Sequence, residues 1–178
     1  MGSPSSGEPP VASLTCQVAL PGPLAAARAV LADPGSLCCF PGISGPSADG
    51  FAQDLDLPVL GERRQAVAIS VDAGPAAPGS AWIALSASGA LVSMAGGWRL
   101  EDGDTGMRAE LRLEYRVAEE LRRQAVDAYR SRSPLPIRTD ADAILTRLVD
   151  DLLRQKFEQD AATYRQRVAA LLESRGAA

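Results

Sequence analysis

The most reactive side chains in this 178-residue chain are its three cysteines, Cys16, Cys38 and Cys39. They contain no C-x-x-C pair, so their spacing indicates neither a zinc site nor a disulfide framework. Adjacent cysteines rarely bond to each other, because the ring that they would close is strained. We therefore expect buried or unreactive thiols in a reducing compartment, with a redox-sensing Cys38–Cys39 pair as the alternative.

Acid–base chemistry has few candidates in this sequence. The chain contains no histidine, which removes the usual general base near neutral pH and excludes a Ser-His-Asp or Cys-His unit. Lys156 is the only lysine, and its charged helical surroundings argue against a Schiff-base role. Asp33, which precedes Pro34, is better interpreted as a helix cap than as a catalyst. There is no glycine-rich phosphate loop either, so we predict no catalytic residue, no metal site and no cofactor.

Composition limits the class of protein. The net charge of -4 argues against a nucleic-acid-binding protein, which needs a basic surface to neutralise phosphates. No apolar run approaches the roughly 20 residues that span a bilayer, so no transmembrane segment is expected. Residues 1–10 are rich in Gly, Ser and Pro and lack the pattern of a signal peptide. We expect a disordered leader over residues 1–11, a single domain over residues 12–175 and a cytoplasmic location.

Alternating apolar residues predict strands through the first two thirds of the domain. Residues 12–20 alternate with period two and form the first expected strand. After a short Ala-rich helix over residues 24–32, further strands are expected over residues 51–59, 67–71, 81–87, 91–100 and 107–117. The last of these alternates apolar residues with Arg and Glu, which predicts one face on a core and one solvated face with cross-strand ion pairs. Gly96-Gly97 predicts a bulge or a sharp bend.

The C-terminal third is helical in pattern. Residues 119–130 predict a short helix, and a longer one follows the proline-containing loop at residues 131–138. About 35 residues at about 1.5 Å each give a helix on the order of 50 Å long. This exceeds the width of the domain, so we expect the helix to bend or its last turns to project beyond the sheet. Its apolar stripe is expected to consist of Ile144, Leu145, Leu148, Leu152, Phe157, Ala161, Tyr164, Val168, Leu171 and Leu172.

A strand, short helices, antiparallel strands and one long C-terminal helix form the order of a helix-grip fold. Residues 31–42 read Leu-Ala-Asp-Pro-Gly-Ser-Leu-Cys-Cys-Phe-Pro-Gly. This stretch resembles one in the SRPBCC (START-like) superfamily. It is most similar to the G-subunit group of carbon monoxide dehydrogenase, which tends to have Cys-Leu-Pro-Gly at its end, and to polyketide cyclase/dehydratase-like proteins. The likeness covers roughly residues 12–170.

The resemblance implies an α+β fold in which a curved antiparallel β-sheet of six or seven strands wraps around the long helix. It also implies two short helices after the first strand, and a cavity between sheet and helix. Members of the superfamily commonly bind lipids, quinones, polyketides or other apolar molecules. The G-subunit-like proteins are associated with membrane recruitment of a redox enzyme.

Candidate cavity-lining residues come from the motif, the middle strands, the last strand and the helix. They are Leu37, Phe40, Trp82, Met94, Trp98, Tyr115, Leu148 and Leu152. Core packing is the more common explanation for any one of them. Aromatic residues make up only 4% of the chain, so an interior of Ala, Val and Leu favours open space.

Three functions remain open. The first is non-enzymatic binding of an apolar or amphipathic small molecule. The second is a cyclase/dehydratase-type enzyme, which requires a polar residue such as Tyr115 or Ser93 pointing into the cavity. The third is an interaction module in which the long helix, or the stretch around Tyr129, binds a partner protein or a second copy as a homodimer.

Overall fold

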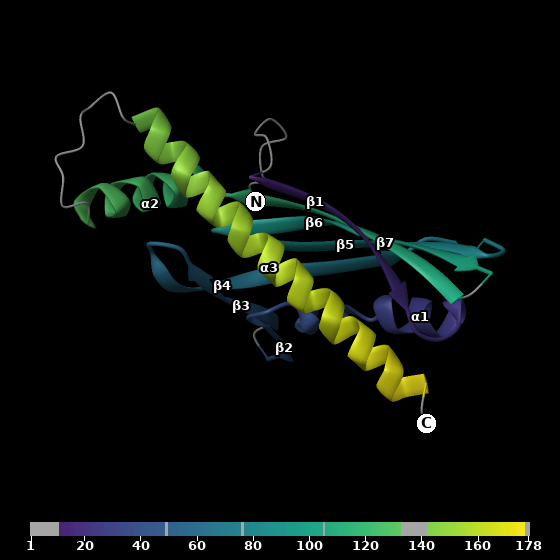
Figure 1. Ribbon diagram of the computed structural model, residues 1–178. Helices are drawn as coiled ribbons and strands as arrows, with labels where there is room; N and C mark the ends of the chain where they lie inside the picture. Colours follow the sequence, from purple (N-terminus) through teal and green to yellow (C-terminus); the bar gives the residue numbers. More distant parts are fainter. Residues whose placement is uncertain (1–10, 49, 76, 105, 133–141, 177–178) are drawn as a thin grey trace.

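A computed structural model describes residues 11–48, 50–75, 77–104, 106–132 and 142–176. Seven strands form one antiparallel sheet in the order β1-β7-β6-β5-β4-β3-β2, and the long C-terminal helix α3 lies across one face of it (Figure 1). This is the helix-grip arrangement that the sequence predicts, including the two short helices after the first strand. The elements are β1 (Ala12–Leu20), α1 (Leu24–Leu31), the 3-10 helix η1 (Pro34–Cys39), β2 (Ile43–Ser47), β3 (Gly50–Leu57), β4 (Gly61–Ala73), β5 (Ser80–Gly89), β6 (Val92–Gly103), β7 (Gly106–Val117), α2 (Glu119–Arg132) and α3 (Asp142–Gly176).

Strand β7 has the two faces that its alternating sequence predicts. Its apolar side chains are buried: Met107, Ala109, Leu111, Leu113, Tyr115 and Val117. On the outer face, Arg112 pairs with Glu110 at 2.5 Å and Arg116 pairs with Glu114 at 3.6 Å. These pairs join neighbouring outward residues of the same strand, whereas the sequence analysis expected pairs across strands. Because they are solvated, they stabilise the sheet only slightly.

Residues 33–42, which connect α1 to β2 and are called the rim below, have the structure that the Asp33-Pro34 motif predicts. The Asp33 carboxylate accepts a hydrogen bond from the backbone N–H of Gly35 at 2.9 Å and caps η1. Pro34 occupies the first turn of η1, where its missing N–H costs nothing. Leu37 and Phe40 are buried beneath this turn.

Strand β2 has no counterpart in the sequence analysis. Only Ile43 is buried on this strand, and the other four residues are exposed, so no alternating pattern marks it. It pairs with β3 at the edge of the sheet.

The glycine pair in β6 does not form a bulge. Gly96 and Gly97 pair one to one with β5 and with β7, so of the two predicted alternatives, a bulge or a sharp bend, the bulge is wrong. The glycines instead allow close backbone approach. A Cβ on Gly96 would lie 2.0 Å from the carbonyl oxygen of Arg112, and one on Gly97 would lie 2.3 Å from that of Ile83. A side chain at either position would therefore collide with the backbone of the neighbouring strand.

The buried face of α3 is shifted from the predicted stripe in its first half. Ile144 is 69% exposed, while Leu148 and Leu152 are half-buried. Val149 and Leu153, each one residue further along the chain, are buried in their place. From Phe157 onward the predicted stripe is buried, apart from Leu171, which is half-buried. The full buried face comprises Leu145, Val149, Leu153, Phe157, Ala161, Tyr164, Val168 and Leu172.

Both ends of α3 pack against other parts of the chain. The helix remains on the core as far as Leu172, so its last turns do not project as a free arm. Its first half is covered by α2, whose Arg122 makes a bidentate ion pair with Asp150 at 2.9 and 2.6 Å. Residues 133–138 of the predicted loop and residues 1–10 of the expected leader lie outside the described residues, whereas residues 131 and 132 belong to α2.

The buried side chain of Gln65 on β4 connects this strand to β3 and to the start of β6. The Gln65 side-chain oxygen accepts hydrogen bonds from the backbone N–H groups of Leu91 (2.8 Å) and Val92 (3.2 Å). Its amide nitrogen donates to the Val92 carbonyl (2.9 Å) and to Gln53 (2.8 Å). One side chain on β4 thus satisfies the backbone where β6 begins and also reaches β3.

We expect Gln65→Met to lower the free energy of unfolding by about 2 to 4 kcal/mol. Methionine preserves much of the volume but leaves buried backbone groups of Val92 without partners, at roughly 1 to 3 kcal/mol each. Urea unfolding of both proteins measures the difference. Gln17→Met, at an exposed position on β1, is the control and should change little. Equal losses in the two variants would contradict this role for Gln65.

Candidate functional site

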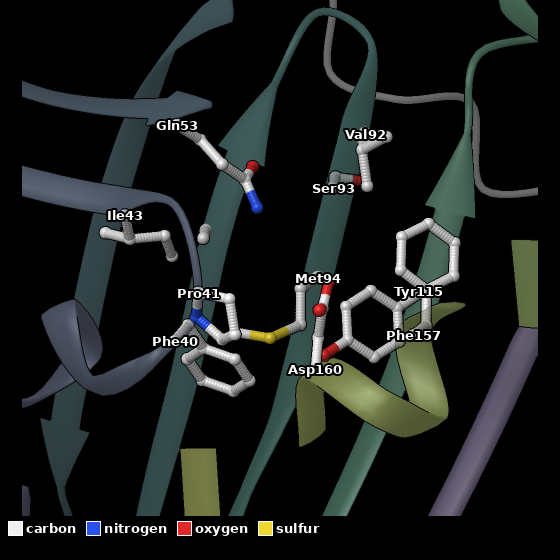
Figure 2. Close-up of a pocket in the computed structure, with 11 residues that line it drawn as sticks. Phe40, Pro41, Ile43, Gln53, Val92, Ser93, Met94, Tyr115, Phe157 and Asp160 are labelled. Carbon is white, nitrogen blue, oxygen red and sulfur yellow. The ribbon is translucent and has the colours of Figure 1, made fainter. Parts of the chain in front are cut away.

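A small pocket lies between the sheet, the η1–β2 connection and α3 (Figure 2). It encloses about 10 Å³, which is room for about one water molecule. Small-molecule sites usually have about 300 Å³ or more, so this pocket is far smaller than the cavity expected from the sequence. Its lining residues are Phe40, Pro41, Ile43, Gln53, Ala87, Val92, Ser93, Met94, Tyr115, Phe157 and Asp160.

Stacked aromatic rings occupy the space between the sheet and α3. Tyr115 of β7 stacks on Phe157 of α3, with ring centroids 4.4 Å apart and planes at 4°. Phe40 stacks on Tyr164 of α3 at 3.7 Å and 6°. The indole N–H of Trp98 donates a hydrogen bond to the Tyr164 hydroxyl at 3.0 Å. These contacts fix α3 against the rim and the sheet, and they explain why so little space remains.

The Tyr115 hydroxyl is the most unusual polar group of the pocket. It is buried and has no hydrogen-bond partner among the residues that the structure describes. Burial raises the pKa of this phenol, and the nearby carboxylate of Asp160 adds to the effect. Tyr115 therefore remains a neutral hydroxyl that can donate a hydrogen bond. Leaving such a group unpaired costs free energy, so it is a natural contact point for a bound molecule.

Asp160 supplies a carboxylate to the same pocket. Both of its oxygens accept hydrogen bonds from Lys156, at 2.5 and 2.6 Å, one helical turn earlier on α3. Burial raises the pKa of Asp160, and the adjacent ammonium group of Lys156 opposes that shift. Gln53 from β3 adds a polar side chain to the lining (Figure 2). Ser93 of β6 pairs with the outward residues Ser88 and Arg116, so its side chain belongs to the outer face of the sheet.

The eight residues predicted to line the cavity fall into four groups, of which Trp82 forms the last by itself. Phe40, Met94 and Tyr115 do line the pocket. Leu37 and Trp98 are fully buried in the core, outside the pocket lining. Leu148 and Leu152 lie outside it as well, on the part of α3 whose neighbours Val149 and Leu153 face the core.

Trp82 lies on the opposite face of the sheet, so the expectation that it lines the interior is wrong. It is 44% exposed, because its neighbours Ala81 and Ile83 occupy the inward positions of β5. Its ring covers Gly97, where an added Cβ would lie 2.9 Å from the indole Cζ2.

Phe157, Asp160 and Gln53 line the pocket but were not predicted from the sequence to do so. Asp160 carried a detectable signal, since it follows Phe157 by three residues and precedes Tyr164 by four, next to the apolar stripe of α3. Gln53 also carried one, since it alternates with Leu55 and Leu57, which are buried on β3. Its hydrogen bond to Gln65 depends on the β3–β4 pair and has no local signal.

The three cysteines are free thiols. Burial raises the pKa of each one, which lowers the fraction of reactive thiolate. Arg165 beside Cys16 and Arg167 beside Cys39 oppose the shift without reversing it. These surroundings favour the interpretation as unreactive thiols. In the described ranges, no group of three His, Cys, Asp or Glu side chains is arranged to hold a metal ion.

Comparisons with known proteins gave fold-level similarity only. The chain is similar to a solved structure of a conserved protein from Geobacillus kaustophilus, with 9% identity and a TM-score of 0.44 over 91% of this chain and 95% of that one. It is also similar to Ara h 8.0201, with 11% identity and a TM-score of 0.46 over 91% of this chain and 97% of that one. No family model and no curated protein matches the sequence. Among the described helices, none combines the length and apolar character needed to cross a membrane.

We expect Asp160 to make folding less favourable as the pH rises through its titration. Because its folded-state pKa is raised, its stabilising contribution is complete below the ordinary value of about 3.9 and is lost above the raised value. Asp160→Asn does not titrate, so its stability relative to the wild type should increase as the pH rises from the ordinary pKa of an aspartate, about 3.9, through the raised pKa of Asp160. Urea unfolding at a series of pH values measures this difference. Glu173→Gln, at an exposed position of α3, is the control. A difference that is flat or of opposite sign would contradict the shift.

Proposed function

We propose that this chain is a non-enzymatic binding protein for a small amphipathic molecule, which it holds between the sheet and α3 at the Tyr115 pocket. The main support for the proposal is the buried Tyr115 hydroxyl, which has no hydrogen-bond partner among the described residues. An apolar pocket that contains a few converging polar groups is a common form of small-molecule site. Here the side chains of Tyr115, Asp160 and Gln53 are polar, and most of the remaining lining is apolar.

The charges of the pocket select the chemical class of the ligand. Tyr115 offers a hydrogen bond to a carbonyl or ether oxygen, while the Asp160 carboxylate repels an anionic group. Among lipid-, quinone- and polyketide-like molecules, a neutral compound with a carbonyl group fits best. A fatty acid, whose head group is an anion, fits worst.

The pocket must enlarge to hold such a molecule. The enclosed 10 Å³ accommodates no ligand larger than about one water molecule. Met94 lies in the lining, and its unbranched side chain can change rotamer to open space. Separation of the Tyr115–Phe157 stack would widen the site further, because one ring belongs to the sheet and the other to α3. The proposal is therefore a site that opens on binding rather than a preformed cup.

One observation favours the alternative, a cyclase/dehydratase-type enzyme. Asp160 is a partly buried carboxylate with a raised pKa, next to a neutral tyrosine hydroxyl. This is a pair that can donate and accept protons within one pocket. Under this alternative, Asp160→Asn would retain ligand binding and abolish turnover. The implied role in membrane recruitment of a redox enzyme rests on the resemblance of residues 31–42 and remains a prediction.

Two matched probes test the binding proposal: 2-acetylnaphthalene, a neutral ketone, and 2-naphthoate, an anion with the same rings. Ligand-observed NMR should show binding of the ketone in preference to the carboxylate, because of Asp160. Tyr115→Phe should weaken ketone binding by about 3- to 10-fold, the value of one net hydrogen bond. Tyr129→Phe, on α2 and away from the pocket, is the control.

Native mass spectrometry of the freshly purified protein provides an independent measurement. A co-purifying neutral molecule, displaced by 2-acetylnaphthalene, would support the proposal. If no small molecule co-purifies and neither probe binds, or if Tyr115→Phe and Tyr129→Phe bind the ketone equally, the Tyr115 pocket is not a ligand site.

A further inference from the structure

The outer side of α3 carries an uncharged stripe along most of the helix. The stripe residues are Ile144, Leu148, Leu152, Gln155, Gln159, Ala162 and Gln166. At about 3.6 residues per turn they lie on one side of the helix, opposite its buried face. Ile144 is 69% exposed, Leu148 and Leu152 are half-buried, and Gln155, Gln159 and Gln166 are exposed. A solvated helix face is normally rich in charge, so this outer stripe is atypical of a surface that meets only water.

Helix α2 does not cover the outer stripe. It packs on another side of α3, where Arg122 contacts Asp150 and Arg130 contacts Asp142. In Figure 1, α3 crosses in front of the sheet with its outer side toward the viewer. The stripe is therefore available to a partner.

Charged residues along one flank of the stripe specify what that partner is. Arg147, Asp151, Arg154 and Glu158 follow one another along this flank with alternating sign, and all four are exposed. Arg154 pairs with Asp151 at 2.8 Å within the chain. Arg147 and Glu158 have no ion-pair partner among the residues described, which leaves one charge of each sign free at the two ends of the row.

When two copies of this row run in opposite directions, each positive charge of one copy lies opposite a negative charge of the other. A two-fold axis perpendicular to two helices places the same flank of each copy together, running in opposite directions. With Leu152 near the axis, Arg147 then faces Glu158 of the second copy, and Asp151 faces Arg154. In the same register Ile144 lies opposite the small side chain of Ala162. We propose that the chain forms an antiparallel homodimer through the outer stripe of α3, with these charges setting its register.

The expected dimer is weak. The stripe from residue 144 to residue 162 is about 27 Å long at about 1.5 Å per residue, which is a short interface. Solvated ion pairs contribute little affinity, although they discriminate well between registers and partners. The interface lies on the side of α3 away from the Tyr115 pocket, so it is independent of the proposed ligand site.

Reversal of single charges tests the register. Sedimentation velocity over roughly 1 µM to 1 mM should show wild-type dimers at the upper end of the range. Arg147→Glu and Glu158→Arg should each shift the protein to monomer, because each places like charges opposite one another. The double variant R147E/E158R should dimerise again. A mixture of the two single variants should also associate, since the reversed charge of each variant then faces a charge of opposite sign on the other.

Two control variants show whether the dimer forms through this stripe. Arg63→Glu, at an exposed position on β4, changes the net charge as Arg147→Glu does and should leave association unaltered. Leu148→Gln should weaken the dimer without affecting the core. A wild-type protein that is monomeric at 1 mM overturns the proposal. So does a dimer that survives both single reversals, which would mean that the copies meet through another surface.

Discussion

The contact of Tyr164 with Phe40 and Trp98 fixes the arrangement of this molecule. Its ring lies flat on Phe40, which belongs to the rim after η1. Its hydroxyl accepts a hydrogen bond from Trp98 in β6. One side chain of α3 thus meets the rim and the sheet together. All three residues are buried, so the hydrogen bond is expensive to lose and the stack is difficult to rearrange.

This contact fixes the rotation of α3 about its own axis. With Tyr164 inward, Phe157 faces Tyr115 and Asp160 enters the pocket beside it. The same rotation brings Val149 and Leu153 to the core and turns Ile144 outward. The rotation of α3 about its own axis therefore determines both the small pocket and the outer stripe. Filling the interior with stacked rings leaves little open volume, which is why the site has to open if it binds a ligand.

The sequence predicts the architecture well because the signals for it are local. The alternation in β7, the Asp33–Pro34 cap and the length of α3 each depend on residues close together in the chain. Long-range packing decides the features that the sequence does not predict. Leu148 and Val149 are both apolar, and only the sheet and α2 together determine which one faces the core. The size of Trp82 favours an interior position, although the period-two pattern of β5 places it with the outward residues.

Pocket residues are harder to predict than strands for the same reason. Tyr115 can be predicted from the sequence because it alternates with charged residues along β7. Phe40 can be predicted because it lies in the motif of residues 31–42. Gln53 faces inward by its alternation with Leu55 and Leu57, but its hydrogen bond to Gln65 crosses a strand pair, and nothing near it in the sequence indicates that contact. The sequence marks Gly96 and Gly97 as special positions, but the tight backbone contact that requires them depends on β5 and β7 together.

The different surroundings of the two tryptophans give the protein a built-in optical reporter. Trp82 is exposed on the outer face, whereas Trp98 is fully buried and bonded to Tyr164. A soluble quencher such as iodide should reach the first indole and spare the second, so the emission of the two can be separated. The shielded emission then follows the attachment of α3 to the sheet, because any movement of the helix away from β6 would expose Trp98 and shift its emission to longer wavelength.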